Sequence, residues 1–162
     1  DLLQPKNLRF SSRTNHIKTR CKTFDQTMTE SILKEYFENK IGSEFLSADL
    51  NGSIKKLTYD TSEISVVEME SDSEYEVEPQ HVYKILTDTL NGNLTFDNLK
   101  TIASGLMFSE YFTWDSETEI GERVANILFE LDNTGIGFPI TTENLKLWKE
   151  YLESGIHKLK MK

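Results

Sequence analysis

The sequence predicts an α+β fold, with a small antiparallel β element in the N-terminal half and four or so packed helices in the C-terminal half. Apolar and polar residues alternate in much of the stretch from 53 to 78, as expected of half-buried strands. Between 79 and 155 the apolar residues recur at helical spacing instead. Because strands and helices fall in separate halves and do not alternate, an α+β arrangement is favoured over a βαβ one.

Length and composition are typical of one globular domain. The chain has 162 residues, of which 37% are hydrophobic and 28% charged, so it is long enough to bury a core without a disulfide or a metal. We expect a single domain over 1–162, with a basic arm or short strands at 1–22, a helix plus the β element at 23–78, and a helical part at 79–162.

In the N-terminal half, the first predicted helix has Thr29 as its N-cap and stops at Gly42. Its apolar residues recur at helical spacing: Ile32, Leu33, Tyr36, Phe37 and Ile41. Asn51-Gly52 predicts a tight turn, and strands are expected over 53–59 and 63–69.

Each of the four helices predicted in the C-terminal half has a start signal, and three of them have a stop signal. The starts are Pro79, Thr95, Ser116 with Glu119 three residues later, and Thr142. The second helix, with apolar residues up to Met107, is compatible with continuation through Phe112. Turn residues end the others at Asn91-Gly92, at 132–135 and at Ser154-Gly155.

Charge is distributed unevenly along the chain. The formal net charge is −9, which excludes bulk attraction to nucleic acid or to anionic membranes. Residues 1–22 carry a net charge of +5, and residues 23–162 carry −14. A basic arm therefore precedes a strongly acidic body.

Eight acidic residues and no basic residue lie between Asp60 and Glu78. The last six occupy consecutive even positions: Glu68, Glu70, Asp72, Glu74, Glu76 and Glu78. In an extended strand they would form a ladder of carboxylates on one face, since alternate residues share a face. Two shorter strands around a turn at 71–73, or a solvated acidic loop, are the alternatives.

Carboxylates stacked along one face repel one another unless a cation compensates them. Two sources of cation are open. One is internal, because Lys18, Arg20 and Lys22 also alternate along the basic arm. The other is a basic partner protein.

The chain shows no catalytic or metal-binding motif. His16, His81 and His157 are not at metal-ligand spacing, and Cys21 has no partner cysteine. Phosphate-binding glycine loops are also missing from the sequence. We expect no enzymatic activity, no cofactor, no metal site and no small-molecule substrate.

An aromatic group follows the acidic run: Phe108, Tyr111, Phe112 and Trp114, with Asp115 next. At helical spacing such a stripe is more often core than binding surface. Tyr and Trp are also favoured anchors of protein interfaces, so any part exposed beside acids would suit a basic partner.

The lone Cys21 excludes an internal disulfide and suits a reducing compartment. No run of 18 apolar residues occurs, so we expect no membrane span and no membrane partner. These features predict a cytoplasmic protein. The chain begins at Asp1 and not at Met, so a lost upstream targeting segment stays open.

Over about residues 100–155 the sequence resembles a known group of proteins. The resemblance lies in Ile102-Ala103 with 108–115, in 127–131, and in 138–145 with Trp148, Tyr151 and Leu152. These residues are similar to small acidic bacterial proteins encoded beside polymorphic toxins, including immunity proteins of contact-dependent growth inhibition systems. The resemblance implies a non-enzymatic cytoplasmic inhibitor that binds one toxin domain and covers or distorts its active site.

The sequence thus predicts an immunity protein that neutralises a basic, nuclease-type toxin through an acidic surface, since an acidic face speeds and selects binding to a basic partner. The expected partner-binding residues are Glu68, Glu70, Asp72, Glu74, Glu76, Glu78, Tyr75, Tyr111, Trp114 and Asp115. One alternative is an acidic adaptor domain without a toxin partner. Another is a carboxylate-dependent metal hydrolase.

Overall fold

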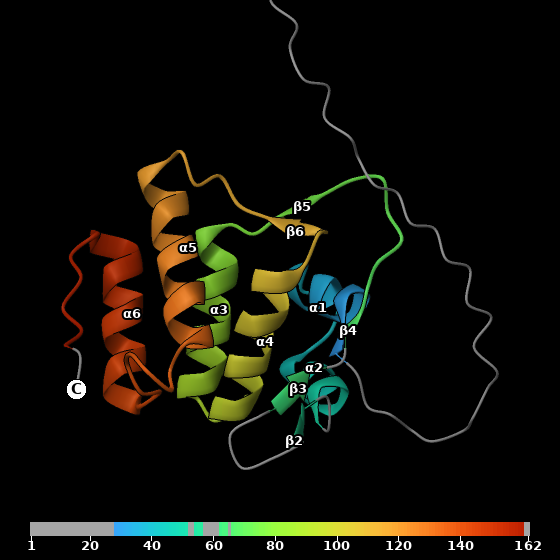
Figure 1. Cartoon of the computed structure of the whole chain (residues 1–162), viewed down its shortest axis with the longest axis horizontal. Coiled ribbons are helices and arrows are strands. Elements are labelled where there is room, and N and C mark those ends of the chain that lie inside the picture. The colour runs from blue at the N-terminus through green and yellow to red at the C-terminus, as the bar shows by residue number, and fades with distance from the viewer. Residues whose placement is uncertain (1–27, 52–53, 57–61, 65, 161–162) are drawn as a thin grey trace, which may run out of the picture.

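Six helices frame the part of the chain that the computed structural model describes, which is residues 28–51, 54–56, 62–64 and 66–160 (Figure 1). They are α1 (Glu30–Phe37), α2 (Ser43–Leu50), α3 (Pro79–Leu90), α4 (Phe96–Phe108), α5 (Glu119–Asp132) and α6 (Thr142–Ser154). The α+β class is confirmed. The four helices predicted in the C-terminal half and the one predicted in the N-terminal half are present in the described residues, and α2 is an additional, sixth helix. The basic arm at 1–22, with Lys18, Arg20 and Lys22, lies outside the described residues.

The four C-terminal helices pack side by side, chiefly α4 against α5 and α3 against α6 (Figure 1). Their apolar positions recur every three or four residues, so each helix presents one apolar face to its neighbours. Leu99, Ile127, Leu145 and Trp148 are fully buried there. Burying a side chain of this size stabilises the fold by roughly 1.5–3 kcal/mol, so this apolar packing is the main source of stability.

The N-terminal helices α1 and α2 extend this arrangement beyond α4 (Figure 1). Helix α2 was not predicted, because its eight residues directly follow Gly42, which was interpreted as a stop. The signal was the spacing of Leu46 and Leu50, both buried. Met28 fills the space above Gly105 of α4, where an added Cβ would meet the Met28 side chain.

Threonine hydroxyls cap three of the C-terminal helices. Thr95 accepts a hydrogen bond from the Asn98 backbone N–H at 3.0 Å, which confirms the predicted start of α4. The caps of α5 and α6 are Thr118 and Thr141 and not the predicted Ser116 and Thr142. In each case the threonine lies three residues before the backbone N–H that it accepts, which is the geometry of an N-cap.

The β structure in the described residues consists of three two-stranded pairs, and only one of them is antiparallel. That pair is β2 (Ile54–Lys56) with β3 (Ser62–Ile64). The other pairs are parallel and join β1 (Met28–Thr29) to β4 (Val66–Val67), and β5 (Tyr75–Glu76) to β6 (Phe112–Thr113). The antiparallel prediction is therefore wrong for two pairs. Parallel strands need a long crossover, which α1 and α2 supply to the first pair and α3 and α4 to the second.

The six predicted ladder acids do not share one strand. From Glu68 to Glu74 the chain is irregular, with a bend at Asp72 and Ser73, and regular pairing resumes only at β5. The Ser73 backbone N–H donates to the Ser71 hydroxyl across this bend at 3.2 Å. An exposed, irregular stretch with a bend at 72–73 is therefore present. The strands on either side of it, β4 and β5, pair with β1 and β6 and not with each other. We call residues 68–78 the acidic segment.

Helix α4 ends at Phe108, so the predicted continuation through Phe112 is wrong. Ser109 leaves the helical conformation, and its hydroxyl accepts hydrogen bonds from the backbone N–H groups of Tyr111 and Phe112 at 3.0 Å each. Those groups would otherwise have bonded within the helix. Among the helices of the described residues, none combines the length and apolar character needed to cross a membrane.

Candidate functional site

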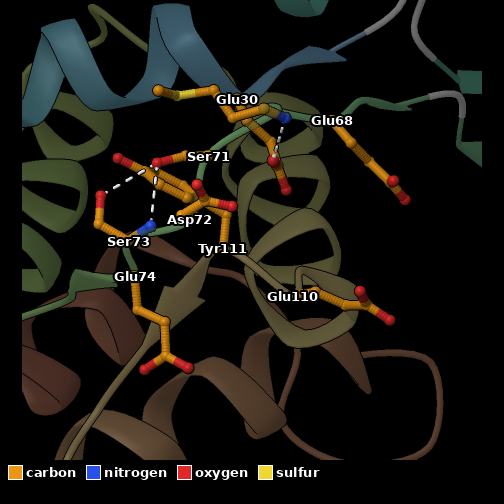
Figure 2. Close-up of a pocket in the computed structure, with 9 residues that line it drawn as sticks. Glu30, Glu68, Ser71, Asp72, Ser73, Glu74, Glu110 and Tyr111 are labelled. Atoms are coloured by element: carbon orange, nitrogen blue, oxygen red, sulfur yellow. Dashed lines mark hydrogen bonds between the residues drawn. The ribbon is translucent and has the colours of Figure 1, made fainter. Parts of the chain in front are cut away.

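A cavity of about 250 Å³ opens between the acidic segment, the N-terminus of α1 and the loop that joins α4 to β6 (Figure 2). Its lining is dominated by carboxylates, and no Lys or Arg is part of it. The lining residues are Glu30, Glu68, Met69, Ser71, Asp72, Ser73, Glu74, Glu110 and Tyr111. Five of these nine are acidic, so the cavity concentrates negative charge from three separate stretches of the chain. We call it the acidic cavity.

Glu30, in the first turn of α1, holds the walls of the acidic cavity together. Its side chain is 1% exposed. Its Oε2 accepts a hydrogen bond from the Met69 backbone N–H at 2.7 Å, as Figure 2 shows, and its Oε1 accepts one from the Ser109 hydroxyl at 2.5 Å. Hydrogen bonds to a charged acceptor are among the stronger ones, so one carboxylate joins the acidic segment to the end of α4.

The β5–β6 pair fixes the other end of the acidic segment. The backbone N–H of Tyr75 donates to the Tyr111 carbonyl at 2.8 Å, and that of Val77 donates to the Thr113 carbonyl at 2.7 Å. Val77 is buried, whereas the acidic residues 68, 70, 72, 74, 76 and 78 are all exposed. The expected separation of carboxylates from apolar residues therefore holds at β5, without a continuous strand.

Aromatic rings form a wall behind the acidic segment. The Tyr75 ring centroid lies 6.3 Å from that of Tyr111 and 5.6 Å from that of Phe112. Phe37 of α1 stacks on His81 of α3 at 4.8 Å. The cluster joins two helices to the β5–β6 pair and holds the acidic segment against the helices.

One cation of the described chain already uses this wall. The Lys34 Nζ atom lies 6.0 Å from the ring centroid of Tyr75 and 5.8 Å from that of Tyr111, within the range of a cation–π contact. A hydrogen bond to Tyr111 raises the pKa of Lys34, so the lysine stays charged. The two tyrosine rings thus lie beside the ammonium group of a lysine of this chain.

His81 lies beneath the acidic segment at the start of α3. Its Nδ1 accepts a hydrogen bond from the Glu78 backbone N–H at 3.0 Å, so this nitrogen carries no proton. Burial lowers the pKa of His81, and Lys84 lowers it further, while Glu78 raises it. Since burial is the largest of these effects, the neutral ring is favoured.

The structure brings only part of the predicted partner-binding set to the acidic cavity. Glu68, Asp72, Glu74 and Tyr111 line it, and Tyr75 contacts Tyr111 beside it. Glu70, Glu76 and Glu78 are exposed on the acidic segment outside the lining.

Trp114 and Asp115 lie beyond β6 and do not line the acidic cavity. Trp114 packs partly buried against the core, and Asp115 accepts a hydrogen bond from the Glu117 backbone N–H at 3.1 Å in the turn before α5. Phe108, by contrast, is 80% exposed at the end of α4. The aromatic group is therefore divided between the core and the surface.

Two acids of the cavity were not predicted. Glu30 looked like an ordinary first-turn acid of a helix, and a buried carboxylate gives no sequence signal of its own. Glu110 directly precedes the predicted Tyr111, and that adjacency was the one available sign.

The chemistry available at the acidic cavity is attraction of positive charge. Within the residues that the structure describes, no group of three or more His, Cys, Asp or Glu side chains is placed to hold a metal ion. The carboxylates of the cavity are spread over its wall and are suited to Lys or Arg groups of a partner.

In comparisons with known proteins, no protein-family model, no curated protein and no solved structure matches the chain.

Proposed function

We propose that this chain is a non-enzymatic immunity protein of the cytoplasm that binds a cognate basic toxin domain of the nucleic-acid-cutting type. The acidic cavity and the exposed carboxylates of the acidic segment form the binding surface. One observation carries the proposal: five carboxylates from three stretches of the chain surround one cavity whose lining contains no Lys or Arg. Such uncompensated charge favours association with a basic partner.

A toxin that cuts nucleic acid needs basic residues to hold phosphates. An inhibitor that presents carboxylates to those residues gains association rate and selectivity. The tyrosine wall supports the same assignment, because Tyr75 and Tyr111 already accept the ammonium group of Lys34 at about cation–π distance. A Lys or Arg of the partner would meet the cavity carboxylates beside this contact of Lys34 with the two tyrosines.

The direct test is to produce this chain together with the polypeptide encoded immediately upstream of it. We expect protection of the host from growth arrest and a complex whose association rate falls steeply with added salt. A complex that forms without any toxicity to relieve would favour an acidic adaptor domain. An association rate that is unchanged by salt would contradict the electrostatic basis of the proposal.

A matched pair of charge reversals sharpens this test. Asp72→Lys with Glu74→Lys changes the acidic cavity, and we expect the association rate to fall by about tenfold or more, in line with the contribution of electrostatic steering. Glu143→Lys with Glu153→Lys makes the same change in net charge on exposed positions of α6, which Figure 1 places at the far end of the row of helices from α1. The α6 pair should keep most of the association rate.

A further inference from the structure

Two apolar side chains are exposed where the chain enters and leaves the walls of the acidic cavity. Phe108, the last residue of α4, is 80% exposed, and Val67, the last residue of β4, is 48% exposed. Single apolar residues scattered over a surface are ordinary, whereas exposed apolar residues gathered at one place indicate an interaction site. The question is therefore whether these two residues belong to one place.

The buried carboxylate of Glu30 brings the two stretches together. One of its oxygens accepts a hydrogen bond from the hydroxyl of Ser109, which directly follows Phe108. The other accepts one from the backbone N–H of Met69, two residues after Val67. Neighbouring Cα atoms are about 3.8 Å apart, so each exposed apolar residue begins within about 8 Å of a residue bonded to this one carboxylate. We call Val67 and Phe108 the apolar rim.

The apolar rim adjoins carboxylates on both sides. Glu68 follows Val67, and Glu110 lies two residues after Phe108, and both acids line the acidic cavity (Figure 2). Protein interfaces combine an apolar centre with polar and charged surroundings, and a few large side chains contribute most of the binding energy. The apolar rim and the acidic cavity together have this composition.

Charge complementarity selects what can cover this surface. Five of the nine residues that line the acidic cavity are acidic, and none is Lys or Arg. A second copy of the chain would bring carboxylates against carboxylates, and nucleic acid or an anionic membrane would be repelled in the same way. A basic protein surface is attracted. To cover the apolar rim as well, that surface must carry an apolar side chain among its basic residues.

We propose that Phe108 and Val67 are the apolar anchors of the partner-binding surface, and that the partner presents an apolar side chain flanked by Lys or Arg. The inference rests on the proposed function, because it specifies the partner of the same surface. The two kinds of contact have separate effects. The carboxylates speed association, whereas the buried apolar contact slows dissociation.

Two synthetic peptides test the required partner chemistry on the full chain. Each has two lysines on either side of one central residue, which is leucine in the first peptide and serine in the second. In NMR titrations at low salt, we expect both peptides to shift the amide signals of residues 67–74 and 109–111. The leucine peptide should bind about fivefold more tightly, as expected of one well-placed apolar contact.

A matched pair of variants assigns this advantage to the apolar rim. Phe108→Ser should bind the two peptides about equally. Phe129→Ser should keep the advantage of the leucine peptide, because Phe129 is 57% exposed on α5, and no residue of α5 lines the acidic cavity. Unchanged signals from the buried residues of α3–α6 report that the fold is intact. The proposal is overturned if the native chain binds both peptides equally or binds neither, or if Phe108→Ser keeps the advantage.

Sedimentation of the native chain and of Phe108→Ser tests the second copy as the occupant. We expect both to be monomers, and a native dimer that Phe108→Ser dissociates would overturn the choice of a basic partner. The peptide titrations need no toxin, so they give the same answer if the chain fails to protect a host. Protection of the host without any preference for the leucine peptide would remove the apolar anchors and leave the immunity function standing.

Discussion

The helical region α3–α6 and the acidic segment are held in place by different forces. Helices α3–α6 bury apolar side chains against one another along their whole length. The acidic segment is fixed by one buried carboxylate, two backbone hydrogen bonds to the β6 strand and its adjoining loop, and a few aromatic contacts. A charged surface is thus carried on a scaffold of apolar helices, to whose core the acidic segment itself contributes the buried side chain of Val77.

The largest effect should come from damage to the helical region. Trp148 of α6 is fully buried, and its Nε1–H donates to Glu130 at 2.7 Å. We expect Trp148→Ala to lower the free energy of unfolding by about 3–5 kcal/mol, because it leaves a cavity and removes the donor to one oxygen of Glu130, whose other oxygen stays paired with His157. Urea unfolding followed by circular dichroism measures this.

Phe129→Ala on α5 is the control for Trp148→Ala. Phe129 is 57% exposed, so its removal should change the free energy of unfolding by no more than about 0.5 kcal/mol. A small effect of Trp148→Ala would contradict the view that apolar packing in α3–α6 dominates stability.

A smaller and more local effect is expected at the carboxylate that ties the acidic segment down. Glu30→Gln keeps the shape but turns one of the two oxygens into an N–H₂ group, which cannot accept. Of the hydrogen bonds from the Met69 N–H and the Ser109 hydroxyl, only one therefore keeps its acceptor. We expect a loss of about 1–3 kcal/mol and faster hydrogen exchange at the Met69 amide.

The exposed Glu110→Gln lines the same acidic cavity and is the matched control. It should leave both the free energy of unfolding and the exchange at Met69 nearly unchanged. Exchange at Met69 that is equally fast in the two variants would show that the acidic segment is held by something other than Glu30.

The sequence predicts the helical region more fully than it predicts the strand pairs beside the acidic segment. The helices α3–α6 were predicted because each is at least 12 residues long and repeats its apolar positions over three turns. The pairing of the strands was not predicted. The partners β1 and β4, and likewise β5 and β6, lie more than 35 residues apart in sequence, and the alternation of apolar and polar residues does not indicate which strand pairs with which.

Of the candidate site, the sequence predicted the exposed acidic residues but not the buried carboxylate that holds them in place. Alternation identified the acidic run, since it is a local property of the sequence. Glu30 and the end of α4 at Ser109 depend on each other across 79 residues, and no local pattern reports such a contact. Tyr111 was named for its residue type, although the helical spacing assigned to it was wrong.

Acidification should act on the junction between the two regions. Because burial lowers the pKa of His81 in the folded state, the unfolded chain binds a proton more readily. The contribution of neutral His81 to the free energy of unfolding is therefore fully present above the unfolded pKa of about 6.5. It decreases as the pH falls from this value towards the lower pKa of the folded state. Protonation also removes the Nδ1 acceptor of the Glu78 N–H.

NMR titration of the His81 ring protons measures this shift directly. We expect a midpoint below that of an unfolded His peptide, with Glu78 opposing the shift and Lys84 adding to it. His81→Gln should remove the response of the Glu78 amide over the same pH window. A midpoint above the peptide value would mean that the neighbouring carboxylates outweigh burial.

The smallest effect on stability should come from the most drastic change of charge. Glu70, Asp72, Glu74 and Glu76 are all exposed, and no described basic residue forms an ion pair with them. Reversing all four to Lys should change the free energy of unfolding by no more than about 0.5 kcal/mol per position, because exposed positions rarely contribute more. Binding to a basic partner should nevertheless weaken strongly, because the same four positions supply its electrostatic attraction. Unfolding and association measured on one variant therefore separate the two roles of charge. Loss of the fold would mean that these carboxylates are paired internally and that the acidic segment is part of the scaffold.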